Sequence, residues 1–123
     1  MEFRILGPLE VVEHGRSLPL GGARQRTLLA LLLTRANEVV SADRLIDELW
    51  GAEPPRGAAN ALQYHVSQLR KALAPSEAIV TQEPGYVIRV GPDELDLLRF
   101  EALVEEARQA APELAAQPAS RAR

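Results

Sequence analysis

The segment from Arg56 to Leu73 constrains the fold more than any other part of this sequence. Its large apolar residues recur at helical spacing, which predicts a helix from about Gly57 to Leu73 that Pro75 ends. One narrow stripe of this helix is apolar and must face a core; it consists of Leu62, Val66, Leu69 and Leu73. The other side of the helix is therefore available to solvent or to a partner.

This other side carries no carboxylate, although a solvated helix face usually mixes glutamate with lysine. Its residues are Asn60, Ala61, Tyr64, Ser67, Gln68 and Lys71, with His65 and Arg70 at its two borders. Amide and hydroxyl groups can hydrogen-bond base edges, and tyrosine or alanine can touch a thymine methyl group. An ordinary amphipathic helix with a polar exterior explains the same pattern, so this helix alone leaves both interpretations open.

The neighbouring segments favour nucleic-acid recognition. A helix is predicted from Ala42 to about Trp50, because Ser41 is a good N-cap and Gly51 a good terminator. After the long helix, β-rich runs at residues 79–81 and 86–88 flank turn-forming residues and predict a hairpin. Helix, connection, helix and hairpin is the order of a winged helix-turn-helix, which is a DNA-binding arrangement.

The first part of the chain predicts a small sheet and a further helix. Apolar and polar residues alternate within residues 3–20, which predicts an antiparallel sheet of three or four short strands. A leucine-rich helix follows from Ala23 to Ala36. Its first turn holds Arg24 and Arg26, which oppose the helix dipole; contact with phosphate explains them, and so does chance. The predicted class is α+β.

A fourth helix is predicted from Glu94 to about Ala111. Its apolar positions are Leu95, Leu98, Leu103, Val104 and Ala107. Residues 112–123 are rich in alanine, proline and small polar residues, which is typical of a frayed or disordered end. We therefore divide the chain into a domain at residues 1–91 and a helical or partly disordered appendage at residues 92–123.

The distribution of charge matters more than the net charge of −3. Residues 1–90 hold ten basic and ten acidic residues, whereas residues 91–123 hold four basic and seven acidic. The excess negative charge therefore lies in the appendage. The net charge of zero over residues 1–90 is the best support for an alternative function, a winged helix that binds protein and not DNA. In that alternative, Trp50 and the stripe of Leu95, Leu98 and Leu103 mark a partner surface; otherwise they are core.

The composition argues against an enzyme and a metal site. The chain has no cysteine, and its two histidines lack metal-ligand spacing with carboxylates. No cofactor is expected. No apolar run approaches the ~18 residues needed to span a bilayer, and the start lacks the pattern of a signal peptide. We therefore expect a cytoplasmic protein of the nucleoid, without membrane association.

Several ordered motifs resemble one known family. They are RQRTLLALLL (24–33), VSADRLIDELWG (40–51), PP (54–55), ANALQ (59–63), VSQLRKAL (66–73) and PGY (84–86). Together they are similar to the OmpR/PhoB-type winged-helix domain of the Streptomyces antibiotic regulatory protein (SARP) family, over about Phe3 to Val90. A weaker match, at Asp96, Leu98, Arg99, Phe100 and Leu103, resembles the opening helix of the bacterial transcriptional activator domain.

The resemblance implies an activator of secondary-metabolite genes that binds direct repeats near promoters. By the family pattern, the major-groove contacts are Asn60, Ala61, Tyr64, Ser67 and Gln68, and the phosphate contacts include His65 and Arg70. We add Arg24, Arg26 and Lys71 to the phosphate contacts because of their charge. The resemblance places Thr81, Gln82 and Tyr86 in the wing, and RNA polymerase (sigma or alpha subunit) at Glu53, Pro54, Pro55 and Arg56. It also implies a second copy on the DNA.

Two features depart from the family pattern. Glu83 lies in the wing, where a cation suits the minor groove better. The chain also contains about one helix of an activator domain that in the family has many.

Overall fold

The computed structural model describes residues 1–110, which form four helices and two three-stranded sheets. The predicted tail at residues 112–123 lies outside the described residues. The first sheet is antiparallel, in the order β1 (Glu2–Arg4), β2 (Glu10–Glu13) and β3 (Arg16–Ser17). The second has the order β4 (Val40–Ser41), β6 (Gly85–Ile88) and β5 (Ile79–Gln82). This confirms the predicted α+β class, with its N-terminal sheet and C-terminal hairpin.

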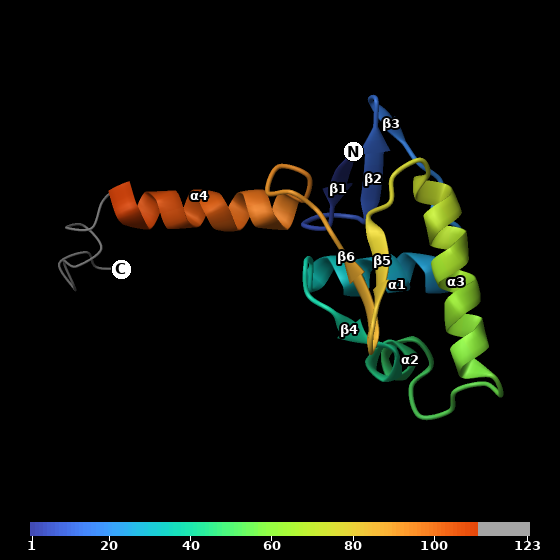
Figure 1. Cartoon of the computed structure of the whole chain (residues 1–123). Helices are drawn as coiled ribbons and strands as arrows, with labels where there is room; N and C mark the ends of the chain where they lie inside the picture. The colour runs from blue at the N-terminus through green and yellow to red at the C-terminus, as the bar shows by residue number, and fades with distance from the viewer. Residues whose placement is uncertain (111–123) are drawn as a thin grey trace.

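Three helices lie between β3 and β5 in sequence, with β4 between the first two, and a fourth follows the hairpin. They are α1 (Ala23–Thr34), α2 (Ala42–Trp50), α3 (Ala58–Leu73) and α4 (Asp96–Ala110). Helix α2 has the predicted bounds because Ser41 Oγ accepts a hydrogen bond from the amide of Arg44 (3.1 Å) and Gly51 ends it at a φ of 68°. Figure 1 shows α1, α2 and α3 grouped around the strands, while α4 projects away from them.

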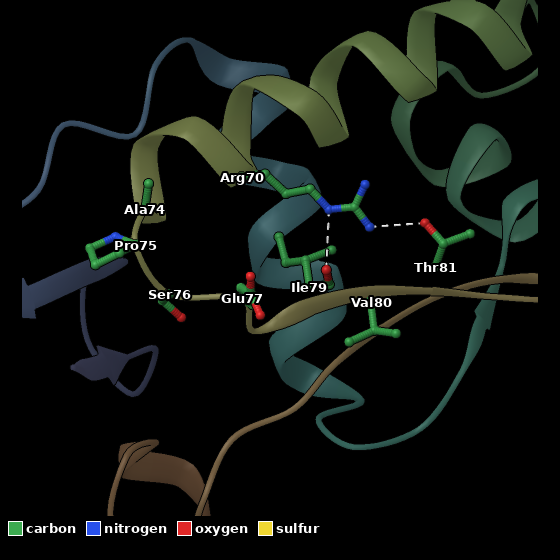
Figure 2. Close-up of a pocket in the computed structure, with 8 residues that line it drawn as sticks. All are labelled: Arg70, Ala74, Pro75, Ser76, Glu77, Ile79, Val80 and Thr81. Carbon is green, nitrogen blue, oxygen red and sulfur yellow. Dashed lines mark hydrogen bonds between the residues drawn. The ribbon is translucent and has the colours of Figure 1, made fainter.

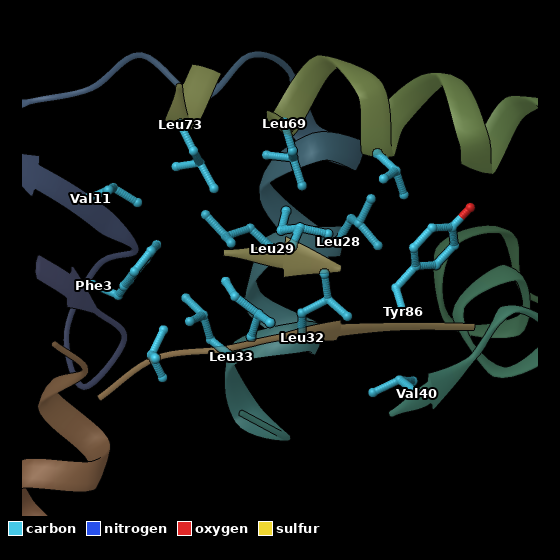
Figure 3. Packing of buried hydrophobic residues seen from close by; sticks show 14 of the residues in the cluster. Phe3, Val11, Leu28, Leu29, Leu32, Leu33, Val40, Leu69, Leu73 and Tyr86 are labelled. Atoms are coloured by element: carbon cyan, nitrogen blue, oxygen red, sulfur yellow. The ribbon is translucent and has the colours of Figure 1, made fainter. Parts of the chain in front are cut away.

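One apolar core joins the three helices to both sheets. Helix α1 supplies Leu28, Leu29, Leu32 and Leu33, all of them fully buried. The sheets contribute residues such as Phe3, Val11, Val40 and Ile88, and the predicted stripe of α3 completes the cluster (Figure 3). In α2, however, only Leu45 is fully buried, and the predicted stripe residues Ile46, Leu49 and Trp50 are half-buried at the edge of the core.

Long-range contacts shift two predicted helix ends. Helix α1 stops at Thr34 and not at Ala36, because Asn37 adopts a φ of 69° and its side chain pairs with the backbone of Val90 (2.9 and 3.1 Å). Helix α4 starts at Asp96 and not at Glu94, because the preceding residues run along β1. The amide of Phe3 donates to the carbonyl of Glu94 (2.6 Å).

These contacts attach the start of α4 to the first sheet. Leu95 is fully buried, and the Asp96 carboxylate accepts hydrogen bonds from the amides of Ile5 (2.9 Å) and Leu6 (3.1 Å). Further along the helix, Phe100 and Leu103 are 54% and 57% exposed, so core packing does not explain Leu103. The division at residue 91 stays a prediction, although residues 94–96 pack with the sheet that precedes it.

Candidate nucleic-acid interface

Helix α3 presents its polar side to solvent. Its four apolar stripe residues face the core, and no acidic residue occurs in its first turn or elsewhere along it. Among the predicted base contacts, Asn60, Tyr64 and Ser67 are exposed, and the Tyr64 side chain is 58% exposed. Ala61 and Gln68 are half-buried and lie at the border of this surface. The five predicted groove-facing residues therefore lie along an accessible, acid-free side of one helix.

An aromatic cluster connects this helix to α1 and α2. The His65 ring lies between those of Tyr64 and Trp50, with centroid distances of 5.4 and 6.1 Å. The guanidinium of Arg24 lies over the Trp50 ring, 5.3 Å from its centroid. Nδ1 of His65 is 2.5 Å from Oε1 of Gln25; the amide oxygen only accepts, so Nδ1 carries the proton. Sequence patterns did not reveal this cluster, because it depends on contacts between three helices.

The surroundings of His65 favour its neutral form. Partial burial, and then the positive charge of Arg24, lower the pKa of His65 below its ordinary value of 6.5. The surroundings of the ring therefore favour its neutral form, in which Nε2 holds a lone pair. A phosphate contact through Nε2 requires the ring to take up a proton that its surroundings oppose. The phosphate contact of His65 stays a prediction, and it requires protonation of the ring.

Three of the other predicted phosphate contacts are exposed cations. Arg24 and Arg26 lie in the first turn of α1, where Gly22 provides no capping side chain and no acidic residue is present. Nη2 of Arg26 also donates to the carbonyl of Leu9 (3.2 Å), which holds the side chain against the first sheet. Lys71 lies in the last turn of α3. The fourth, Arg70, is exposed but hydrogen-bonded to the hairpin, as described below.

The hairpin β5–β6 has an exposed end and a buried base. Thr81 and Gln82 are exposed, as predicted for wing contacts, and so is Glu83 in the turn. Tyr86 is only 8% exposed; it packs at one end of the core (Figure 3) and offers little surface to a ligand. Arg89 is not among the predicted wing residues, but its Nη2 donates to Oε1 of Gln82 (3.1 Å) and thus places a cation beside the wing. The signal for its exposure was its charge, because arginine is almost never fully buried unless it is paired; alternation was no guide, since all four residues of β6 are buried.

The loop between α2 and α3 contains the predicted polymerase contact. Glu53, Pro54, Pro55 and Arg56 are all exposed. Gly57 adopts a left-handed conformation (φ 67°) and turns the chain into α3, which is why the helix starts at Ala58. The loop is therefore accessible at one end of α3.

No group of three or more potential metal ligands occurs within residues 1–110. None of the helices in the same range is both long and apolar enough to cross a membrane.

The helix arrangement, the accessible face of α3 and the hairpin beside it define a winged-helix domain of the DNA-binding type. Solved structures support this class. The DNA-binding domain of Escherichia coli CadC superposes with a TM-score of 0.57 at 29% identity, over 65% of this chain and 78% of that one. Mycobacterium tuberculosis EmbR, solved with a low-affinity phosphopeptide, gives a TM-score of 0.77 at 37% identity, over 82% of this chain and 28% of EmbR.

Residues 15–88 match the family described as "Transcriptional regulatory protein, C terminal", and this chain belongs to that family. Among its relatives, the regulatory protein AfsR of Streptomyces coelicolor is 40% identical over 111 residues, and DnrI of Streptomyces peucetius is 32% identical over 120. These matches confirm the resemblance to the SARP family. They identify a regulatory domain and not an enzyme. Each match covers 89% of this chain but only 11% of AfsR and 44% of DnrI.

Proposed function

We propose that this chain is the DNA-binding domain of a transcriptional activator, and that α3 enters the major groove of duplex DNA. The accessible, acid-free face of α3 is the observation that carries this proposal. Its side chains are suited to base edges, and the groove-facing contacts are Asn60, Ala61, Tyr64, Ser67 and Gln68. A carboxylate on this face would repel phosphates on both sides of the groove.

The proposed phosphate contacts are Lys71 on this face and two arginines of the neighbouring helix α1. Arg24 and Arg26 at the start of α1 and Lys71 at the end of α3 are exposed cations. In the wing, Thr81 and Gln82 reach toward the minor groove, and Arg89 supplies a positive charge that offsets Glu83. Although residues 1–90 have no net charge, the acid-free face of α3 therefore lies together with exposed cations.

Selection from random duplexes at two salt concentrations tests DNA binding. With roughly four to six phosphates neutralised per domain, log affinity should fall with log salt at a slope of about −4 to −5. Tyr64→Ala and Gln68→Ala should change which sequence is preferred. Gln109→Ala, an exposed amide on α4 and therefore outside the proposed face, is the matched control. Absence of any binding to duplex at low salt would refute the proposal and favour the protein-binding alternative.

We further propose that two copies bind direct repeats near promoters of secondary-metabolite genes, and that the α2–α3 loop contacts RNA polymerase. Exposure of the loop at the end of α3 supports the second part, because it can be reached while α3 lies in the groove. In transcription assays with purified polymerase, Glu53→Ala and Arg56→Ala should reduce activation and leave DNA affinity unchanged. If activation and DNA affinity fall together, the loop contacts DNA and not the polymerase. A strictly one-to-one complex on repeat-containing duplex would contradict the paired arrangement.

A further inference from the structure

The Arg70 side chain joins α3 to both strands of the wing. Its Nε donates to the carbonyl of Ile79 (3.1 Å) and its Nη2 donates to Oγ1 of Thr81 (2.9 Å), as Figure 2 shows. Its guanidinium also lies over the ring of Tyr86 in β6, 6.0 Å from the ring centroid. One side chain thus contacts β5 through two hydrogen bonds and β6 through an aromatic face.

We propose that Arg70 is a positioning residue that sets the wing at a defined angle to α3, and that it does not serve mainly as a phosphate contact. The inference rests on the proposed DNA binding. The contacts of Arg70 with the wing depend on the planar guanidinium, which directs several N–H groups in one plane and stacks through its face. A lysine ammonium has neither the second, fixed donor direction nor the flat surface.

The location of β5 explains why such a connection is needed. β5 is the outer strand of its sheet and pairs only with β6 among the described strands. An open groove lies between it and the end of α3, lined by residues such as Ala74, Pro75, Ser76 and Val80 (Figure 2). The Arg70 side chain spans one edge of this groove. Without it, the orientation of Thr81 and Gln82 relative to α3 would depend on the pairing of β6 with β4 and on the core packing at the base of the hairpin.

The salt dependence of DNA affinity separates the two roles. A side chain that neutralises a phosphate contributes about 0.9 to the slope of log affinity against log salt, whereas a positioning residue contributes none. Arg70→Ala should therefore weaken binding by about three- to tenfold with an unchanged slope, because the wing is less preorganised. Lys71→Ala, which removes the neighbouring exposed cation, is the matched control and should reduce the slope by about one.

Arg70→Lys provides the second variant. It keeps the charge, so it should rescue a phosphate contact but should not restore the wing. Double-mutant analysis with Thr81→Val should give a combined loss smaller than the sum of the single losses, because Arg70 acts partly through Thr81. Rescue by lysine, or a slope reduced as much as in Lys71→Ala, would overturn the inference.

Hydrogen exchange of the unliganded protein gives a readout that does not require DNA. In Arg70→Ala and Arg70→Lys, the amides of β5 and β6 should exchange faster, while those of α1 should not change. Suppose that the wild-type protein fails to bind duplex DNA, while the hairpin amides exchange faster in the two variants than in wild type. The proposed function then fails and the positioning role stands. If exchange in the hairpin is unaffected, the positioning role is wrong even where DNA binding is normal.

Discussion

Replacing Gly85 by alanine should separate β4 from the hairpin. A Cβ added at Gly85 would lie 1.9 Å from the carbonyl oxygen of Val40, and 2.8 Å from both the amide nitrogen of Ala42 and the Cα of Ser41. All three are backbone atoms, so no side-chain rotation relieves the contact. The strands must move apart by more than ~1 Å to reach ordinary van der Waals separation.

The size of the effect follows from the contacts that this movement disrupts. At the affected end, Val40 pairs with Tyr86 and Ser41 with Gly85, and the amide of Ala42 donates to the carbonyl of Pro84 (3.1 Å). Loss of two or three hydrogen bonds, at about 1 kcal/mol net each, lowers the free energy of unfolding by about 2–3 kcal/mol. For a domain of this size, that corresponds to a fall in melting temperature of roughly 10–20 °C.

Thermal melting followed by far-UV circular dichroism measures this effect. Gly7→Ala is the matched control, because no heavy atom lies within 4 Å of a Cβ built there. Its melting temperature should stay within a few degrees of wild type. If Gly85→Ala melts as close to wild type as Gly7→Ala does, the close approach of β4 to the hairpin does not exist as described.

Two further predictions concern the attachment of α4 and the effect of pH. Asp96→Ala leaves the amides of Ile5 and Leu6 without their acceptor and should lower the free energy of unfolding by about 1–3 kcal/mol in urea titrations. Asp96→Asn should cause a smaller loss. Equal stability of wild type and both variants would contradict this prediction. Because the pKa of His65 is lowered in the folded state, its contribution to stability is complete above its ordinary pKa of 6.5 and is lost as the pH falls below it. Wild type should therefore lose more melting temperature than His65→Gln between about pH 7.5 and 5, and parallel curves for the two proteins would refute the assignment.

Elements with local signals were predictable from the sequence. The Ser41 cap and the Gly51 terminator lie within a few residues of the helix they bound, so α2 has its predicted limits. The buried stripe of α3 follows from helical spacing, and the same spacing places Tyr64 on the exposed side. A face without carboxylates is likewise a property of sequence order, which is why the candidate surface could be identified before its geometry was known.

Features that depend on distant partners could not be predicted in this way. Asn37 ends α1 by pairing with Val90, 53 residues later, and Glu94 and Leu95 lie along β1 at the other end of the chain. Burial of the ring and then Arg24, from another helix, lower the pKa of His65, and the hydrogen bond to Gln25, 40 residues before it, sets which ring nitrogen carries the proton. Arg70 has the composition of a phosphate contact, yet its donors are directed to the hairpin. Helical periodicity specifies the side of a helix on which a residue lies, whereas packing specifies its partner, and the partner determines its chemistry.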